Sequence, residues 1–324
     1  MNSTTTNSLN ANLYKRQLRQ QKRRQLRKDI WHYRKLYPLM LFGLAFFIIF
    51  SYVPMYGIQL AFKDYSIRLG ITGSEWVGLE NFQTLFARSE FWNAVRNTLI
   101  ISLLKLIFTF PVPILLAICL NEIVSSKVKR TLQIIFTLPH FLSWITISGI
   151  MLALLSTNGT INSLIQILGG SPVKWLSSGP IFIGVIIVSE IWKTAGWTCI
   201  IYMAAIAGID PELYESARMD GANRLKCALH ITWPCIRGTA AILLIMQVGR
   251  AMNANFDQIF NLYNPTVYSV ADIIDTYIFR ITFLQSANYG VSTAVGLFKG
   301  ITNCILLLSA NYIVGKLNRE SKMI

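Results

Sequence analysis

The stretch that decides the fold is Asp210–Pro234, DPELYESARMDGANRLKCALHITWP, which is polar and charged yet lies between two long apolar runs. Its first residues, Asp-Pro, suit a helix N-cap and the first helical position, so a helix is predicted to about Met219. Gly221 permits a sharp turn because glycine tolerates positive φ. A second helix is expected over 222–232, ending before Pro234. We call this predicted pair of short helices the elbow (residues 210–234).

The composition indicates a membrane protein rather than a soluble domain. Hydrophobic residues make up 53% of the 324, and the mean hydropathy is +0.46. The five cysteines form no C-x-x-C pair and the three histidines are scattered, so neither a disulfide framework nor a metal site is predicted. No G-x-x-x-x-G-K-[ST] motif occurs, which excludes a P-loop of the chain's own, and no catalytic triad supports a membrane enzyme. We therefore expect an all-α polytopic protein without catalytic or metal-ligating residues.

The apolar runs predict six membrane-spanning helices, each needing about 20 residues. Several runs contain Pro or Gly, which membrane helices tolerate when neighbouring helices satisfy the freed backbone groups. The predicted spans cover approximately 37–58, 98–120, 132–155, 181–206, 236–255 and 291–314. Aromatic residues within 59–97 are spaced for a short interfacial helix, and residues 257–290 are expected to form a small outer cap.

The positive charges set the orientation of the spans. With the N-terminus in the cytoplasm, 20 of the 30 Lys and Arg residues fall in cytoplasmic segments and six in outer segments. Ten of the 20 lie between Lys15 and Lys35, in a tail expected to rest on anionic lipid. RNA binding by this tail is the alternative, although no recognisable module follows it. The bias explains the basic pI without nucleic acid and puts the elbow and both termini in the cytoplasm.

Polar and ionisable residues inside or beside the spans are candidates for a substrate path. Charges at such depth are costly, so they usually face a partner or a wet cavity. Glu190 and Lys193 lie three residues apart on one predicted helix and are candidates for an ion pair. Aromatic faces with polar groups suit sugar rings, and the positive excess is compatible with an acidic oligosaccharide; the alternative is structural pairing or snorkelling. The candidates are Lys105, Glu190, Trp192, Lys193, Trp197, Arg250, Asn253, Asn255, Asp257 and Lys299.

Most of the elbow carries a recognisable motif. The segment YESARMDGANRLKCALHITWP resembles the EAA signature of binding-protein-dependent (MetI-like) ABC importer permeases, in the form found in carbohydrate importers. Ser216 replaces the middle Ala and Trp233 the usual Leu before Pro, and both departures are mild. Matching positions are Glu215, Ala217, Asp220, Gly221, Ala222, Ile231 and Pro234.

The likeness extends over roughly residues 37–317. WVGLENFQTLF followed by FWNAVRNTL resembles the outer segment and second-span entry of these permeases. YPLMLFGLAFFIIFSYVPMYGIQLAFKDY is similar to the LplB-like subgroup that imports oligosaccharides and polysaccharide fragments, including the first permease subunit of the alginate importer. The resemblance implies a type I ABC importer permease fold. It divides the chain into a basic cytoplasmic tail (1–36), a first span with an outer segment (37–96), a permease core (97–317) and a cytoplasmic C-terminal tail (318–324).

The resemblance also implies a mechanism. Such a permease pairs with a second homologous permease and two ATPase subunits, which use ATP and Mg²⁺, while this chain binds no cofactor. An extracellular or periplasmic solute-binding protein delivers the oligosaccharide to the permease, which lies in the bacterial cytoplasmic membrane. The elbow then corresponds to the coupling helix, with Glu215 as a polar contact to the ATPase, small residues allowing close approach and Asp220 fixing the turn. The ATPase-coupling candidates are Glu215, Ser216, Ala217, Asp220, Gly221 and Ala222.

Other interpretations of the same residues are open. The elbow segment could be an ordinary polar loop, or a DNA-binding helix-turn-helix, although both of its ends are tied to spans. The chain could be an ion-gradient-driven secondary transporter of a small polar solute that uses the buried charges as ion sites. It could also be a membrane receptor or scaffold without transport activity.

Overall fold

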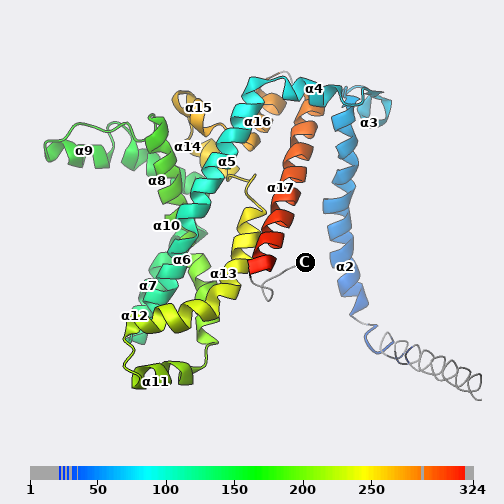
Figure 1. Cartoon of the computed structure of the whole chain (residues 1–324). Coiled ribbons are helices and arrows are strands. Elements are labelled where there is room, and N and C mark those ends of the chain that lie inside the picture. Colours follow the sequence, from blue (N-terminus) through cyan, green and yellow to red (C-terminus); the bar gives the residue numbers. More distant parts are fainter. Residues whose placement is uncertain are drawn as a thin grey trace, which may run out of the picture. The chain divides into compact units, whose positions relative to one another are not determined.

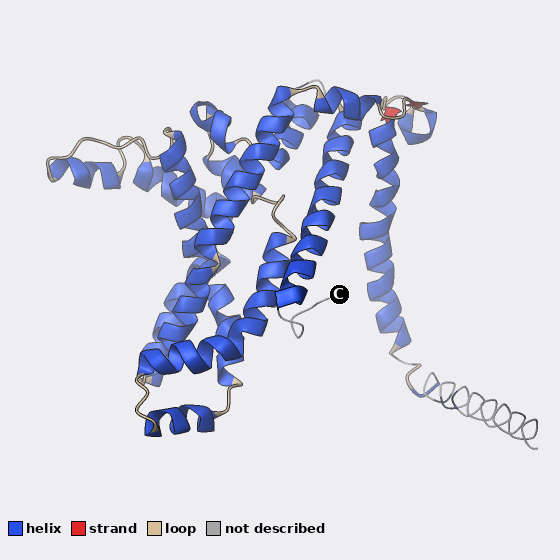
Figure 2. Cartoon of the chain, in the orientation of Figure 1, coloured by secondary structure: helices blue, strands red, loops and turns tan. Residues whose placement is uncertain are grey.

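The computed structural model describes residues 36–285 and 288–317, together with 31–34 and the single positions 22, 25 and 28. Most of the predicted N-terminal tail and all of the C-terminal tail (318–324) therefore lie outside the described residues. Helices dominate, and the only strands among the described residues are β1 (Lys63–Asp64) and β2 (Glu75–Trp76), which pair antiparallel (Figure 2). The chain forms two compact units, one ending at Gln59 and one beginning at Leu60. The expected all-α fold is confirmed.

The first unit is built around the first span. α2 (Tyr37–Phe47) passes into a π-helical turn (Ile48–Tyr52) and then into a 3-10 helix (Val53–Phe62). The π-helical turn directly precedes Pro54, and the N–H of Val53 bonds to the carbonyl of Ile48, five residues back. Proline has no N–H and its ring crowds the carbonyl four residues back, so a widened turn lets the helix continue through it.

The described residues contain six helical segments that are long and apolar enough to cross a membrane, as predicted. The second unit holds five of them. Their helices are α5 (Ser89–Thr109) continued by α6 (Pro111–Asn121), α8 (Trp144–Leu155), α10 (Gly179–Ala207), α12 (Arg224–Cys227) continued by α13 (Trp233–Val248), and α17 (Tyr289–Leu317). The six candidate spans are Met40–Phe62, Ser89–Asn121, Trp144–Ile167, Gly179–Ala207, Arg224–Val248 and Tyr289–Lys316.

Two span boundaries differ from the prediction because prolines and polar residues interrupt the apolar runs. The predicted span 132–155 is wrong as one helix: α7 (Ser126–Thr137) ends at a 3-10 turn (Leu138–Phe141) that contains Pro139, and α8 starts afresh after it. The N-cap of α8 is Ser143, whose hydroxyl accepts a hydrogen bond from the N–H of Thr146. The predicted span 236–255 ends early, at Val248, and a non-helical segment follows it.

The elbow also differs in its second half. The expected helix over 222–232 begins only at Arg224 and does not stop before Pro234. A π-helical turn (Ala228–Thr232) joins α12 to α13, and the N–H of Trp233 bonds to the carbonyl of Ala228. This is the same arrangement as at Pro54. The prediction that Pro234 ends the helix was wrong because a widened turn accommodates a proline, which has no N–H to donate, without breaking the helix.

Short helices lie at both ends of the second unit. α11 (Pro211–Met219) lies at one end, below α12, and the opposite end carries α4 (Glu80–Phe86), α9 (Thr160–Ile167) and a group of short helices (Figure 1). That group consists of α14 (Phe256–Leu262), a 3-10 turn (Pro265–Val267), α15 (Tyr268–Ala271), α16 (Ile274–Phe279) and a π-helical turn (Arg280–Leu284). α3 (Gly70–Gly73) is a further short helix. The helix expected within 59–97 is α4, and the residues expected to form an outer cap, 257–290, hold the group of short helices after α13.

Three buried apolar clusters hold the second unit together. One packs α4, α5, α16 and α17 around Phe91 and Tyr277, and a second packs α8, α10 and α14 around Phe182 and Ile259. The third packs α6, α10 and α13 around Tyr202, on the side of the unit that leads to the elbow. These clusters pack the helices of the second unit against one another.

Candidate functional site

The first candidate site is the turn between α11 and α12. The carboxylate of Asp210 caps α11 by accepting from the N–H of Glu212, and the Asn223 side chain caps α12 in the same way at Lys226. Gly221 has φ +77°, and the N–H groups of Gly221 and Ala222 bond back to the carbonyls of Arg218 and Ala217. This is a Schellman motif with glycine at its left-handed position. Backbone bonds fix the turn, and the structure gives no hydrogen bond for the Asp220 side chain.

The elbow is braced against the spans. The Tyr214 hydroxyl lies 2.9 Å from the hydroxyl of Thr232, inside the π-helical turn. The Arg224 guanidinium donates to the backbone carbonyl of Glu122 at the end of α6 and lies 3.8 Å from its carboxylate. An exposed ion pair contributes little by itself. The Tyr214 contact ties α11 to the π-helical turn, and the Arg224 contact ties α12 to the end of α6.

The six predicted coupling residues come together on this turn. Glu215, Ser216, Asp220 and Gly221 are exposed, whereas Ala217 and Ala222 are half-buried. A Cβ added at Gly221 would meet no atom within 4 Å. The turn therefore presents a small, exposed, conformationally fixed surface at the end of the second unit (Figure 1).

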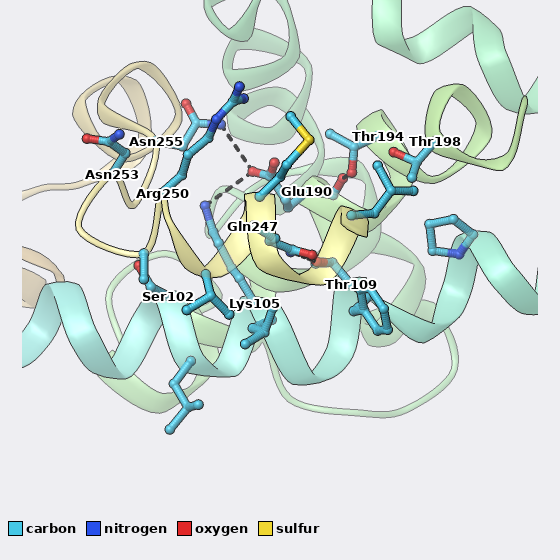
Figure 3. A pocket seen from close by; sticks show the side chains of 18 of the residues that line it. Ser102, Lys105, Thr109, Glu190, Thr194, Thr198, Gln247, Arg250, Asn253 and Asn255 are labelled. Atoms are coloured by element: carbon cyan, nitrogen blue, oxygen red, sulfur yellow. Dashed lines mark hydrogen bonds and ion pairs between the residues drawn. The ribbon is translucent and has the colours of Figure 1, made fainter. Parts of the chain in front are cut away.

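The second candidate site is a cavity of about 720 Å³ between α5, α10, α13 and the segment that follows α13. This volume is within the usual range for ligand sites. Five of the ten substrate-path candidates line it: Lys105, Glu190, Arg250, Asn253 and Asn255 (Figure 3). Threonines from α5 and α10 and apolar side chains, including Phe110 and Tyr202, complete the lining.

A buried hydrogen-bond network closes one side of this cavity. The Lys105 ammonium is 3.2 Å from the Glu190 carboxylate and also donates to the carbonyl of Ala254 and the side-chain oxygen of Gln258. Asn255 donates to the same carboxylate oxygen at 3.1 Å. All three ammonium protons therefore have acceptors, and the negative charge has two donors. A buried ion pair is stable only when its remaining hydrogen-bonding groups also have partners, because both charges have lost their contacts with water.

Glutamine 258 extends the network into α10. Its side-chain amide donates to the carbonyl of Ile186 at 2.7 Å and to the hydroxyl of Ser189 at 2.9 Å. Gln258 is fully buried. The network therefore ties α5, α10 and α14 to one another. Its polar groups bond to each other, because lipid in the membrane interior would offer them no hydrogen-bond partners.

The chain between α13 and α14 is irregular, and side-chain contacts hold it in place. The N–H of Met252 donates to the side chain of Asn303 on α17, and Gly249 lies so close to Leu307 that a Cβ would be 2.5 Å from it. Asn255 has φ +71°, the one positive φ of a non-glycine residue that the structure records. Its side chain nevertheless caps α14 by accepting from Gln258. Irregular backbone at membrane depth is tolerated where it lines a cavity, as this segment does.

The other five substrate-path candidates lie outside the cavity lining. The Lys193 ammonium donates to the backbone carbonyls of His140 and Leu142, at the break between α7 and α8. Trp197 stacks on His140 with ring centroids 4.6 Å apart. Trp192 is about half exposed, Asp257 is exposed on α14, and Lys299 pairs with Asp275.

The expected Glu190–Lys193 pair does not form. Glu190 instead pairs with Lys105 on a different helix, and Lys193 satisfies carbonyls that the proline break leaves without helical donors. Spacing within one helix could not reveal either contact, because both partners come from elements more than 50 residues away.

Sequence reasoning missed several residues that shape these sites. Gln258, Ser189 and Asn303 carry the buried network and the loop contacts, and Tyr214 braces the elbow. Uncharged polar residues in apolar surroundings were the available signal, but their partners lie far away in sequence. Among the described residues, no group of three or more His, Cys, Asp or Glu could hold a metal ion.

The group of short helices after α13, which we call the cap, is anchored to α5 by a second polar network. Asn97 donates to the carbonyls of Ser269 and Asp272, and the Arg280 guanidinium lies 2.7 Å from the Asp272 carboxylate. Burial alone lowers the pKa of Arg280, but the hydrogen bond and charge of Asp272 more than offset it and raise that pKa above its ordinary value. Arg280 therefore stays charged and holds the cap in place at any physiological pH.

Six candidate spans, a cavity lined in part by charged side chains, and a braced, exposed turn are features of multi-span membrane transport proteins. Within this class, the family model "binding-protein-dependent transport system inner membrane component" matches residues 109–319. The chain belongs to this family, and its fold is that of a type I ABC importer permease.

The relatives agree over nearly the whole length of the chain. The chain is 43% identical to protein LplB of Bacillus subtilis (strain 168), covering 91% of this chain and 92% of that protein. It is 41% identical to the polygalacturonan/rhamnogalacturonan transport system permease protein YteP of the same organism, covering 93% and 94%. A crystal structure of a bacterial ABC transporter that imports the acidic polysaccharide alginate matches with a TM-score of 0.83 and 39% identity, covering 91% of this chain and 99% of that one.

Proposed function

We propose that this chain is the permease subunit of an ATP-driven, binding-protein-dependent importer of oligosaccharides or polysaccharide fragments in the bacterial cytoplasmic membrane. In this proposal it pairs with a second homologous permease, and two ATPase subunits hydrolyse ATP with Mg²⁺. A solute-binding protein delivers the sugar from outside. The family and the relatives named above support the importer class and the sugar class. The single observation that carries the coupling role is the fixed, exposed turn between α11 and α12.

The geometry of the elbow suits the transmission of force. In the proposal, α11 sits in a groove of an ATPase subunit, with Glu215 as a polar contact and the small residues Ala217 and Gly221 allowing close approach. Caps at both helices and the Schellman turn support a rigid elbow. Tyr214 connects α11 to the π-helical turn before α13, and Arg224 connects α12 to the end of α6. Closure of the ATPases would move α11, and the spans would rock between inward-facing and outward-facing states.

The proposed membrane topology follows from the charge bias. The elbow and both termini face the cytoplasm, and α4, α9 and the cap face the outside. Support comes from the position of α11 and of these elements at opposite ends of the second unit (Figure 1). The 20-to-6 division of Lys and Arg residues between the two sides supports the same orientation.

Uptake by reconstituted vesicles tests the proposal. We expect vesicles containing both permeases and the ATPases to accumulate a labelled oligosaccharide only with the binding protein outside and ATP inside, and to be insensitive to ionophores. Transport by this chain alone, driven by an ion gradient, would support a secondary transporter instead. A cognate binding protein specific for a peptide or a metal would refute the sugar assignment and leave the importer assignment intact.

Substitutions on the turn test its coupling role. We expect Gly221→Trp and Glu215→Lys to abolish uptake and uncouple ATP hydrolysis from the binding protein, with the chain still present in the membrane. A Cβ at position 221 would meet no atom of this chain within 4 Å, so the added indole is expected to extend into the proposed docking surface, besides straining a left-handed position. The matched control is Glu75→Lys, the same charge reversal on β2 at the other end of the unit (Figure 2). Normal coupled transport by both turn variants would contradict the proposal.

A further inference from the structure

The charges that line the cavity do not balance. Lys105 and Arg250 contribute two positive charges, and Glu190 is the one acidic residue of the lining. Lys105 and Glu190 neutralise each other, and their hydrogen-bonding groups are already used by Asn255, Ala254 and Gln258. One positive charge, that of Arg250, therefore remains without compensation.

Arginine 250 is free to meet a ligand. It is exposed, and among the described residues no acceptor bonds its guanidinium and no carboxylate pairs with it. Figure 3 places it with Asn253 and Asn255 at the end of the cavity where the Lys105–Glu190 pair lies. The contacts of Met252 with Asn303 and of Gly249 with Leu307 hold the backbone on which Arg250 sits. The cation is thus presented from a fixed segment rather than from a mobile loop.

The chemistry of this group selects a class of ligand. A guanidinium stays protonated and presents a planar fork that matches a carboxylate through two parallel hydrogen bonds. A charge that no other group of the chain compensates, at a cavity whose walls are largely apolar, attracts anions. Asn253, exposed beside it, suits the hydroxyls of a sugar.

We propose that Arg250 makes this cavity selective for oligosaccharides that carry carboxylate groups, such as uronic acids, over neutral ones. The inference rests on the proposed function and adds the substrate class and the residue that sets it. The Lys105–Glu190 pair acts differently: it is saturated within the chain and holds the wall of the cavity in place.

The test compares an acidic sugar with its neutral form. Dissociation constants of trigalacturonate and of its fully methyl-esterified form are measured on the purified assembly of both permeases and the ATPases, without the binding protein. We expect the wild type to bind the acid more tightly than the ester, and Arg250→Gln to weaken binding of the acid by about tenfold or more while leaving the ester unchanged. Arg250→Lys keeps the positive charge but not the planar fork of the guanidinium, so it should lose less affinity for the acid than Arg250→Gln does. Arg237→Gln, which removes an exposed arginine from α13 outside the cavity lining, is the matched control.

Four outcomes would overturn the inference. These are equal binding of acid and ester by the wild type, an equal loss for both sugars in Arg250→Gln, binding of neither sugar, and loss of the second permease from the purified Arg250→Gln assembly. The last result would mean that Arg250 pairs with the partner subunit. ATP-driven uptake in vesicles with the binding protein decides the proposed function independently, so the two can fail separately.

Discussion

Lysine 105 is buried, with about 8% of its surface exposed, and its ammonium depends on a single carboxylate, that of Glu190. Removing one partner of such a pair leaves the other charge in a poorly solvated place. We expect Lys105→Met to destabilise the assembled transporter by about 3 kcal/mol, measured by denaturation in detergent. The double variant Lys105→Met/Glu190→Gln should recover much of this loss, because no unpaired charge remains. Equal stability of Lys105→Met and the wild type would contradict the assigned pairing.

For single residues, the sequence indicated which side chains are important, but it did not indicate the partners of those side chains. Lys105, Glu190 and Arg250 stood out because charges in apolar runs are costly. Their contacts could not be predicted, since Lys105 meets Gln258 across 153 residues and Lys193 turned to backbone carbonyls at a proline break. The residues of the elbow were predictable as a group, because capping and the left-handed glycine are local features.

Among the helices, α10 packs against α7 at a position where only glycine fits. A Cβ added at Gly196 would lie 2.1 Å from the carbonyl oxygen of Phe136, which is backbone and cannot rotate away. We expect Gly196→Ala to cost about 1–3 kcal/mol and to lower the midpoint of thermal unfolding of the assembled transporter. Gly184→Ala, on the same helix with no atom within 4 Å, should leave that midpoint unchanged or raise it slightly. Equal shifts for the two variants would argue against this close approach.

The helices themselves were largely predictable, and their breaks were not. Long apolar runs identified all six spans, because the length of a membrane-crossing helix is set by the bilayer. Proline was the source of the errors: Pro139 separates two helices, whereas Pro54 and Pro234 follow π-helical turns that let the helix continue. Whether a proline breaks a helix depends on the local hydrogen-bond register and on tertiary neighbours, which composition does not reveal.

For the whole molecule, the orientation in the membrane is open to direct measurement. In a cysteine-free background, we expect Ser216→Cys on α11 to react with an impermeant thiol reagent only from the cytoplasmic side. Leu168→Cys, exposed just after α9 at the other end of the second unit, should react only from outside (Figure 1). Lys226→Cys on α12 should behave as Ser216→Cys does. Labelling of Ser216→Cys from outside only would refute both the topology and the coupling role.

One continuous rod of 25 residues, Arg224–Val248, starts beside the Gly221 turn and stops two residues short of Arg250. At about 1.5 Å per residue it measures roughly 37 Å, and its π-helical turn keeps it unbroken at Pro234. A continuous helix of this kind transmits a displacement of one end to its other end. If the proposed function holds, sugar bound near Arg250 should alter the affinity of the ATPase for the Gly221 turn, and the energetic effect must be equal in both directions.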